Sequence, residues 1–260
     1  MARAPTTPFD HAPSVVVLAT IVAAALLQGC NAKEAPTSAF IGSPELMTRN
    51  ADGPFQRGYW NRAYDSKDFT EIVVAPVNTQ YVMAQNFWEK ASAAGLSEDQ
   101  VKKDVQSLAD YTRQSFTRAF ADDPKHRFKV VDEVGPKALI LELALTQVVP
   151  SKAALNAIGY VTWIPTMVAA AGSTITQSQD MGKGVVAIEG RIRHGGTGEI
   201  IGMFQDRQNP PVAIVDLKAV SWWAPAKQII DNWSNELVAV ANRPPGGIVK
   251  PAPSFQLLVW

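Results

Sequence analysis

The chain has 260 residues with 24 basic and 24 acidic side chains, so its formal net charge is zero. Hydrophobic residues make up 47% and charged residues 18%, which excludes a disordered, highly charged chain. The lack of a basic surplus argues against nucleic acid as a main partner. A single cysteine excludes an internal disulfide, and with three scattered histidines we expect no Cys/His metal cluster and no cofactor.

An uncharged apolar run occupies residues 14–29, after a segment that contains Arg3. Its length fits the apolar core of a signal peptide and is short for a membrane span, which needs about 20 residues. Cys30, the only cysteine, follows the run directly, and Leu27-Gln-Gly-Cys30 resembles the lipobox of bacterial lipoproteins. The resemblance implies cleavage before Cys30, a diacylglyceryl group on its thiol and acylation of the new amine, so the mature protein is expected to carry palmitate. A secreted protein or a single-span anchor with a chance cysteine is the alternative.

The residue after the lipidated cysteine is a sorting signal in enteric-type lipoproteins, where Asp at this position retains the protein in the inner membrane. Residue 31 is Asn. The resemblance therefore implies the outer membrane, and we expect the protein to face the periplasm.

Residues 30–54 are predicted to be a tether rich in small and polar residues, although Phe40-Ile41 and Leu46-Met47 could pack back onto the body. The aromatic stretch 55–60 is expected to be an arm packed against the domain. Residues 71–77 are β-branched and predict a buried strand, followed by a short helix within 81–94. Residues 98–121 predict an amphipathic helix, because apolar residues recur every three to four positions after a capping box at Ser97 and Gln100.

Two strands are predicted at 127–132 and 138–149, with a turn at Gly135-Pro136, and a hairpin at 184–193 and 199–207. A last amphipathic helix is expected from 222, capped by Ser221, before the Pro/Gly-rich tail 244–260, which has a candidate terminal strand. The predicted fold class is α/β (α+β): a single mixed β-sheet of about five strands covered by two amphipathic helices, with an apolar insertion. The domain itself is expected to span 55–243.

The insertion begins after Lys152, and residues 153–179 carry no charge. We favour a core-filling role for its apolar part, 153–172. A surface that dips into the leaflet or meets a partner is the second interpretation, and Tyr160, Trp163 and Met167 would then be the candidate binding residues. A membrane span is the third, and it would split the sheet across the membrane.

Four stretches carry a family resemblance: PFQRGYW, IVVAPVNTQYV, LELALTQVVPSKAALNAIGY and VAIEGRIRHGGTGEIIGMFQDRQ. From about residue 40 to 243 the chain resembles an uncharacterised bacterial lipoprotein family, domain of unknown function 3313. The resemblance implies an α/β lipoprotein with no assigned reaction.

The sequence carries none of the common hydrolase, nucleotide-binding or zinc-protease motifs. His194 is expected in an exposed turn, and His126 in a charged turn with solvent or Asp123 as its partner. Glu142 and Glu189 lie on apolar strands, where we expect them to point outward; if buried, they would be candidate acid/base groups with perturbed pKa values.

The favoured function is a lipid-anchored interaction or assembly module without catalysis, held to the membrane through Cys30, with an envelope protein as a candidate partner. Two alternatives stay open. One is a small-molecule or lipid-binding protein that uses residues 153–172, and the other is a hydrolase with an unfamiliar site.

Overall fold

The computed structural model describes residues 34, 36–83, 97–149, 185–209 and 223–252. The chain divides into two units, Met1–Asn31 and Ala32–Trp260, and every described residue belongs to the second. The short helix expected within 81–94 is described only as α2 (Gln80–Met83), and the apolar insertion lies outside the described residues, as does Ser221.

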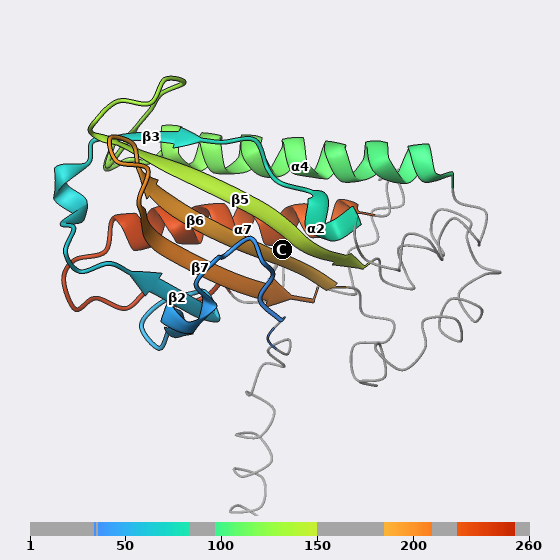
Figure 1. Cartoon of the computed structure of the whole chain (residues 1–260), viewed down its shortest axis with the longest axis horizontal. Coiled ribbons are helices and arrows are strands. Elements are labelled where there is room, and N and C mark those ends of the chain that lie inside the picture. Colours follow the sequence, from blue (N-terminus) through green and yellow to red (C-terminus); the bar gives the residue numbers. More distant parts are fainter. Residues whose placement is uncertain (1–33, 35, 84–96, 150–184, 210–222, 253–260) are drawn as a thin grey trace, which may run out of the picture. The chain divides into compact units, whose positions relative to one another are not determined.

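In the described part of the chain, seven strands form one mixed sheet in the order β1-β2-β7-β6-β5-β3-β4 (Figure 1). They are β1 (Thr48–Arg49), β2 (Arg57–Trp60), β3 (Glu71–Val74), β4 (Lys129–Val130), β5 (Ala138–Val149), β6 (Val185–His194) and β7 (Ile200–Gln208). In this order, neighbouring strands from β1 to β5 are antiparallel. The strand β3 lies parallel to both of its neighbours, β5 and β4. The α/β class and the single mixed sheet are confirmed, and the expected number of about five strands is too low.

The two strands predicted around Gly135-Pro136 do not pair with each other, because β3 lies between them. The chain does turn at this point, where the Ala138 N–H donates to the Gly135 carbonyl at 3.0 Å. Both strands run parallel to β3, and parallel neighbours require a crossover connection rather than a tight turn.

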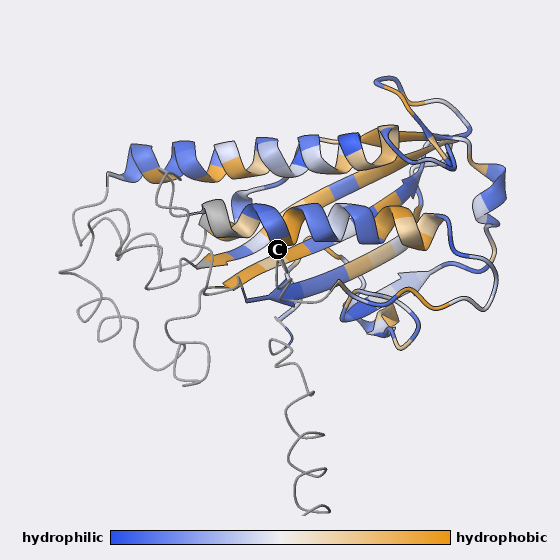
Figure 2. Ribbon diagram, turned by 180° about the vertical axis from the view of Figure 1, so that it is seen from behind, coloured by the Kyte–Doolittle hydropathy of each residue, from blue (hydrophilic) through white to orange (hydrophobic). Residues whose placement is uncertain are grey.

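Helices α4 (Glu98–Ala121) and α7 (Ala224–Ala241) cover one face of the sheet. Seen from this side, Figure 2 shows hydrophobic residues concentrated on the strands behind the helices. The predicted apolar face of α4 is buried at every position, namely Val101, Val105, Leu108, Thr112, Phe116 and Phe120. Burial of such a stripe against a sheet face provides most of the stability of an amphipathic helix.

The helix starts differ in detail from the sequence prediction. Ser97 is the N-cap of α4, but its side chain makes no capping hydrogen bond, and Gln100 donates to Asp104 at 2.9 Å instead of to the N-cap. The predicted capping box is therefore wrong, although the start of the helix is right. Trp223 is the N-cap of α7, with Pro225 in the first turn, where a missing N–H costs little.

The opposite face of the sheet is covered too. Residues 36–47, which we call the strap, cross β7 and β6 and form a second core with the sheet (blue segment in Figure 1). Phe40, Ile41 and Met47 are buried in it, whereas Leu46 is 46% exposed. The part of the predicted tether from residue 36 onward thus packs on the domain, and we call the sheet face beneath it the strap face.

Candidate functional site

The strap is fixed to the middle of the sheet by hydrogen bonds to two buried polar side chains. The Thr37 hydroxyl donates to Gln205 Oε1 of β7 at 2.7 Å. The Ser38 backbone N–H donates to Glu189 Oε1 of β6 at 2.7 Å, and its hydroxyl donates to the other carboxylate oxygen. Both oxygens of Glu189 are therefore held by one residue of the strap.

Glu189 was expected to point outward, and this expectation is wrong, because the side chain is fully buried beneath the strap. Burial raises the pKa of the Glu189 carboxyl, while the two hydrogen bonds from Ser38 and the nearby charge of Arg191 act in the opposite direction. A buried carboxylate is tolerated only where such donors replace its water. The N–H and hydroxyl of Ser38 thus replace water as hydrogen-bond donors to the Glu189 carboxylate.

Two arginines of the sheet bind carbonyl groups of the strap. Arg57 on β2 donates to the Met47 carbonyl at 2.7 Å and to the Pro44 carbonyl at 3.0 Å. Arg191 on β6 donates to the Phe40 carbonyl at 2.7 Å, and its guanidinium lies 4.0 Å from the centre of the Phe40 ring. Guanidinium groups suit this task because they donate in several directions and stack on aromatic faces.

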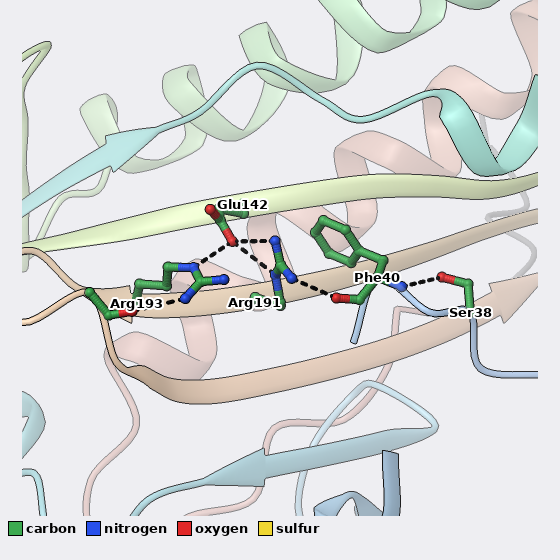
Figure 3. A network of polar contacts seen from close by, with 6 residues as sticks. Ser38, Phe40, Glu142, Arg191 and Arg193 are labelled. Atoms are coloured by element: carbon green, nitrogen blue, oxygen red, sulfur yellow. Dashed lines mark hydrogen bonds and ion pairs between the residues drawn. The ribbon is translucent and has the colours of Figure 1, made fainter. Parts of the chain in front are cut away.

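Beyond the strap, the same face carries a charged cluster of Glu142, Arg191 and Arg193 (Figure 3). Both arginine Nε atoms donate to Glu142 Oε2, at 2.8 and 2.9 Å, and Arg193 also donates to the Gly198 carbonyl. The side chain of Glu142 is 26% exposed. It points out of the sheet as expected, but two arginines already occupy its Oε2 atom.

The two histidines have structural partners. His194, expected in an exposed turn, is half-buried at the end of β6, where its Nδ1 accepts the Gly196 N–H at 2.9 Å and its ring packs edge-on against Phe69. His126 is exposed, and its backbone N–H donates to the Asp123 carbonyl at 2.9 Å, which agrees with the expected local partner.

Two further buried carboxylates, on β7 and α7, were not predicted. Asp206 on β7 accepts hydrogen bonds from Trp233 Nε1 at 2.6 Å and from Gln208 at 2.9 Å. Glu236 on α7 is 5% exposed; its Oε1 accepts the Ala252 N–H at 2.5 Å, and its Oε2 has no partner among the described residues. Burial, with the charge of Asp206 as a further cause, raises the pKa of Glu236 to about 7. The available signal was weak, because both carboxylates have polar neighbours in the sequence: Gln205 and Arg207 flank Asp206, and Asn235 precedes Glu236.

A cleft of about 1000 Å³ lies beside the β1–β2 edge, near the carboxyl ends of α4 and α7. Apolar side chains such as Phe55, Phe128 and Leu237 form part of its wall, and all three are at least nine-tenths buried. Its charged lining residues are Arg49, Arg62, Lys67, Arg243, Asp52 and Asp65. Basic side chains thus outnumber acidic ones by four to two at this cleft.

The remaining site predictions concern Cys30, Asn31, Tyr160, Trp163 and Met167, which lie outside the described residues. Within the described ranges, no helix is long and apolar enough to cross a membrane. The same ranges contain no group of three or more Asp, Glu, His or Cys side chains that could hold a metal ion.

A family model described as "Protein of unknown function (DUF3313)" matches residues 36–237. The chain belongs to this family. The match begins at the first residue of the strap and includes every strand and most of α7. For this DUF3313 protein, no match was found among curated proteins.

Two solved structures similar to this DUF3313 chain are PelC dodecamers from Paraburkholderia phytofirmans, each with 7% sequence identity. One match covers 65% of this chain and 90% of PelC with a TM-score of 0.34. The other covers 70% and 94% with a TM-score of 0.36. We draw no functional conclusion from a likeness at this level.

Proposed function

We propose that this protein is a lipid-anchored lipoprotein of the bacterial outer membrane, facing the periplasm, and that it acts as an interaction or assembly module without catalysis. The observation that carries the proposal is the lipobox-like Leu27-Gln-Gly-Cys30, which places the only cysteine directly after an apolar run. Several acyl chains on Cys30 would anchor the protein stably, since each buried CH₂ contributes about 0.8 kcal/mol.

The polar groups of the strap face support binding rather than chemistry. Both oxygens of Glu189 accept hydrogen bonds from Ser38, and Oε2 of Glu142 accepts them from two arginines. A general acid or base must come within hydrogen-bond reach of a substrate. Glu189 is fully buried and cannot do so while the strap is bound.

The anchor is tested by metabolic labelling with palmitate in a Gram-negative host. Cys30→Ser is expected to abolish the label and to leave unprocessed precursor, whereas labelling of this variant would contradict the proposal.

Asn31→Asp is expected to move the protein toward the inner membrane in a host that follows the enteric rule. Crosslinking of the tagged lipoprotein in native envelopes would then identify its partner.

The cleft beside β1 and β2 favours a second candidate function, the binding of an anionic amphiphile. Its wall combines apolar side chains with a surplus of basic ones, which suits a ligand with an acyl chain and an acidic head group. This site is formed by described residues, unlike the 153–172 segment to which the sequence analysis assigned lipid binding. Mass spectrometry of lipids that copurify with the protein tests it: Arg62→Glu should reduce their amount, and Arg118→Glu on the exposed side of α4 should not.

A further inference from the structure

The strap determines how much of the chain is left as a spacer between the proposed anchor and the domain. The sequence alone suggested a tether that extends from Cys30 to residue 54. The structure instead holds the chain from Thr37 onward, through the hydrogen bond to Gln205 and the buried side chains of Phe40 and Ile41. Only residues 31–36 then separate the lipidated cysteine from the sheet.

This spacer is short compared with the domain. Because an extended chain advances about 3.3–3.6 Å per residue, Thr37 cannot lie more than about 25 Å from Cys30. A free tether that extended to residue 54 would instead reach about 80 Å. The strap therefore reduces the reach of the domain from the membrane by more than half.

The spacer also meets the domain at one particular face. Thr37 and Ser38 bind Gln205 and Glu189 in the middle of β7 and β6, on the side of the sheet opposite α4 and α7. A helix with its side chains is about 10–12 Å across. The distance from the spacer to the outer side of α4 therefore exceeds the distance from the spacer to the strap face by at least this amount.

From this geometry we propose that the strap face lies against the membrane that holds the lipid anchor, and that the outer sides of α4 and α7 point away from it. The partner of the strap face is then a lipid surface, and the helices face the periplasmic space. The inference rests on the proposed lipidation of Cys30, because without an anchor the spacer imposes no orientation.

The test measures energy transfer from a dye on the protein to an acceptor lipid in proteoliposomes of phosphatidylethanolamine and phosphatidylglycerol. The full lipoprotein is used, and acylation of Cys30 is first verified by mass spectrometry. A lipidated Cys30 has no free thiol, so one introduced cysteine provides the only labelling site. The two sites are Val73→Cys, on the strap face of β3, and Ser107→Cys, on the exposed side of α4.

We expect transfer from position 73 to exceed transfer from position 107. Phe40→Ser with Ile41→Ser should release the strap, lengthen the spacer and abolish this difference. Leu46→Ser is the matched control, since it makes the same kind of change at an exposed position of the strap and should preserve the difference. If the double variant does not fold, Thr37→Val with Ser38→Ala removes only polar contacts of the strap and should reduce the difference.

Equal transfer from the two positions in acylated protein would overturn the orientation but not the anchor. A difference that persists after release of the strap, as shown by faster amide exchange at Ser38, would also overturn it. Absence of acylation on Cys30 would overturn the proposed function and the orientation together, so the two failures are distinguishable.

Discussion

At the scale of single residues, Ser38 and Glu189 make the contact on which the strap depends. Ser38→Ala removes the hydroxyl that donates to a fully buried carboxylate. A hydrogen bond to a charged group contributes about 1.5–3 kcal/mol, so we expect the free energy of unfolding to fall by about that amount. Urea unfolding followed by circular dichroism measures the change.

The control for this prediction is Ser43→Ala, also in the strap. Ser43 precedes the 3₁₀ helix η1 (Pro44–Leu46), and its side chain makes no capping hydrogen bond. Its loss should cost less than about 0.5 kcal/mol. Equal effects of the two substitutions would mean that the hydroxyl of Ser38 does not stabilise the strap.

The buried carboxyl of Glu236 predicts that the stability of the domain depends on pH. Its pKa is raised from an ordinary 4.5 to about 7, mainly by burial, so the folded state binds a proton more tightly than the unfolded state. The resulting stabilisation is complete below pH 4.5 and is lost as the pH rises through 7, by about 3 kcal/mol in total.

Glu236→Gln should therefore flatten the decrease in melting temperature between pH 5 and pH 8. Burial raises the pKa values of Glu189 and Asp206 as well, so some decrease in the same direction should remain. The exposed residue Glu45 provides the control, and Glu45→Gln should keep the wild-type profile. An unchanged profile for Glu236→Gln would show that this carboxyl is ionised at little cost.

At the scale of elements, the packing of the central strands β6 and β7 depends on a glycine that lies opposite an aromatic ring. Gly190 on β6 pairs with Phe204 on β7, and Phe204 stacks on Phe55 with ring centres 4.4 Å apart. A Cβ atom at Gly190 would lie 2.2 Å from the Phe204 ring, which is itself buried. Gly190→Ala should thus destabilise the protein by about 1–3 kcal/mol through overpacking.

Phe204 has a second glycine partner, Gly58 on β2. A Cβ atom there would make only ordinary contacts, the nearest being 3.4 Å from Asn50 Nδ2, so Gly58→Ala should cost less than Gly190→Ala. Combining Gly190→Ala with Phe204→Leu should cost less than the sum of the two single changes, because removal of the Phe204 ring relieves the clash that Gly190→Ala creates. Strict additivity in thermal or urea unfolding would contradict the overpacking.

The long elements could be predicted from the sequence because each repeats one simple signal. The helical period of apolar residues located α4 at its observed bounds, and β5 was predicted at 138–149, where it is found. The strands β1 and β4 have two residues each, too few for any period to be detected. The position of β3 between β4 and β5 depends on long-range pairing, which local patterns do not encode.

The strap could be predicted only in part for the same reason. Its apolar pairs indicated that it could pack back onto the domain, but its small and polar residues are also typical of a linker. Glu189 was expected to point outward because the alternation along β6 places it opposite the core face. The side chain does lie on that face, and its burial comes from residues about 150 positions earlier in the chain.

At the scale of the whole molecule, the apolar segment 153–172 decides between the functional alternatives. If it fills the interior, Trp163→Ala should lower the free energy of unfolding by about 3–5 kcal/mol. If it is a membrane or partner surface, the loss should stay under about 0.5 kcal/mol. We expect the interior role, because an apolar run between strands usually fills the core.

The measurement compares melting and liposome flotation of residues 31–260, expressed without lipid, in wild type and variant. A large fall in melting temperature with unchanged flotation supports the interior role. Unchanged melting with lost flotation would contradict it and would favour a lipid-binding surface.

The two edge strands of the sheet determine whether neighbouring molecules can associate by strand pairing. Each margin ends in a strand of two residues, Thr48–Arg49 at one side and Lys129–Val130 at the other. Long open strands invite pairing between chains, and short strands with basic residues discourage it. If the proposed anchor holds the protein in one leaflet, the molecules are crowded in two dimensions, where such pairing would lead to aggregation. Among the described residues, the margins offer only short stretches of backbone for strand addition, so we expect a partner to recognise side chains.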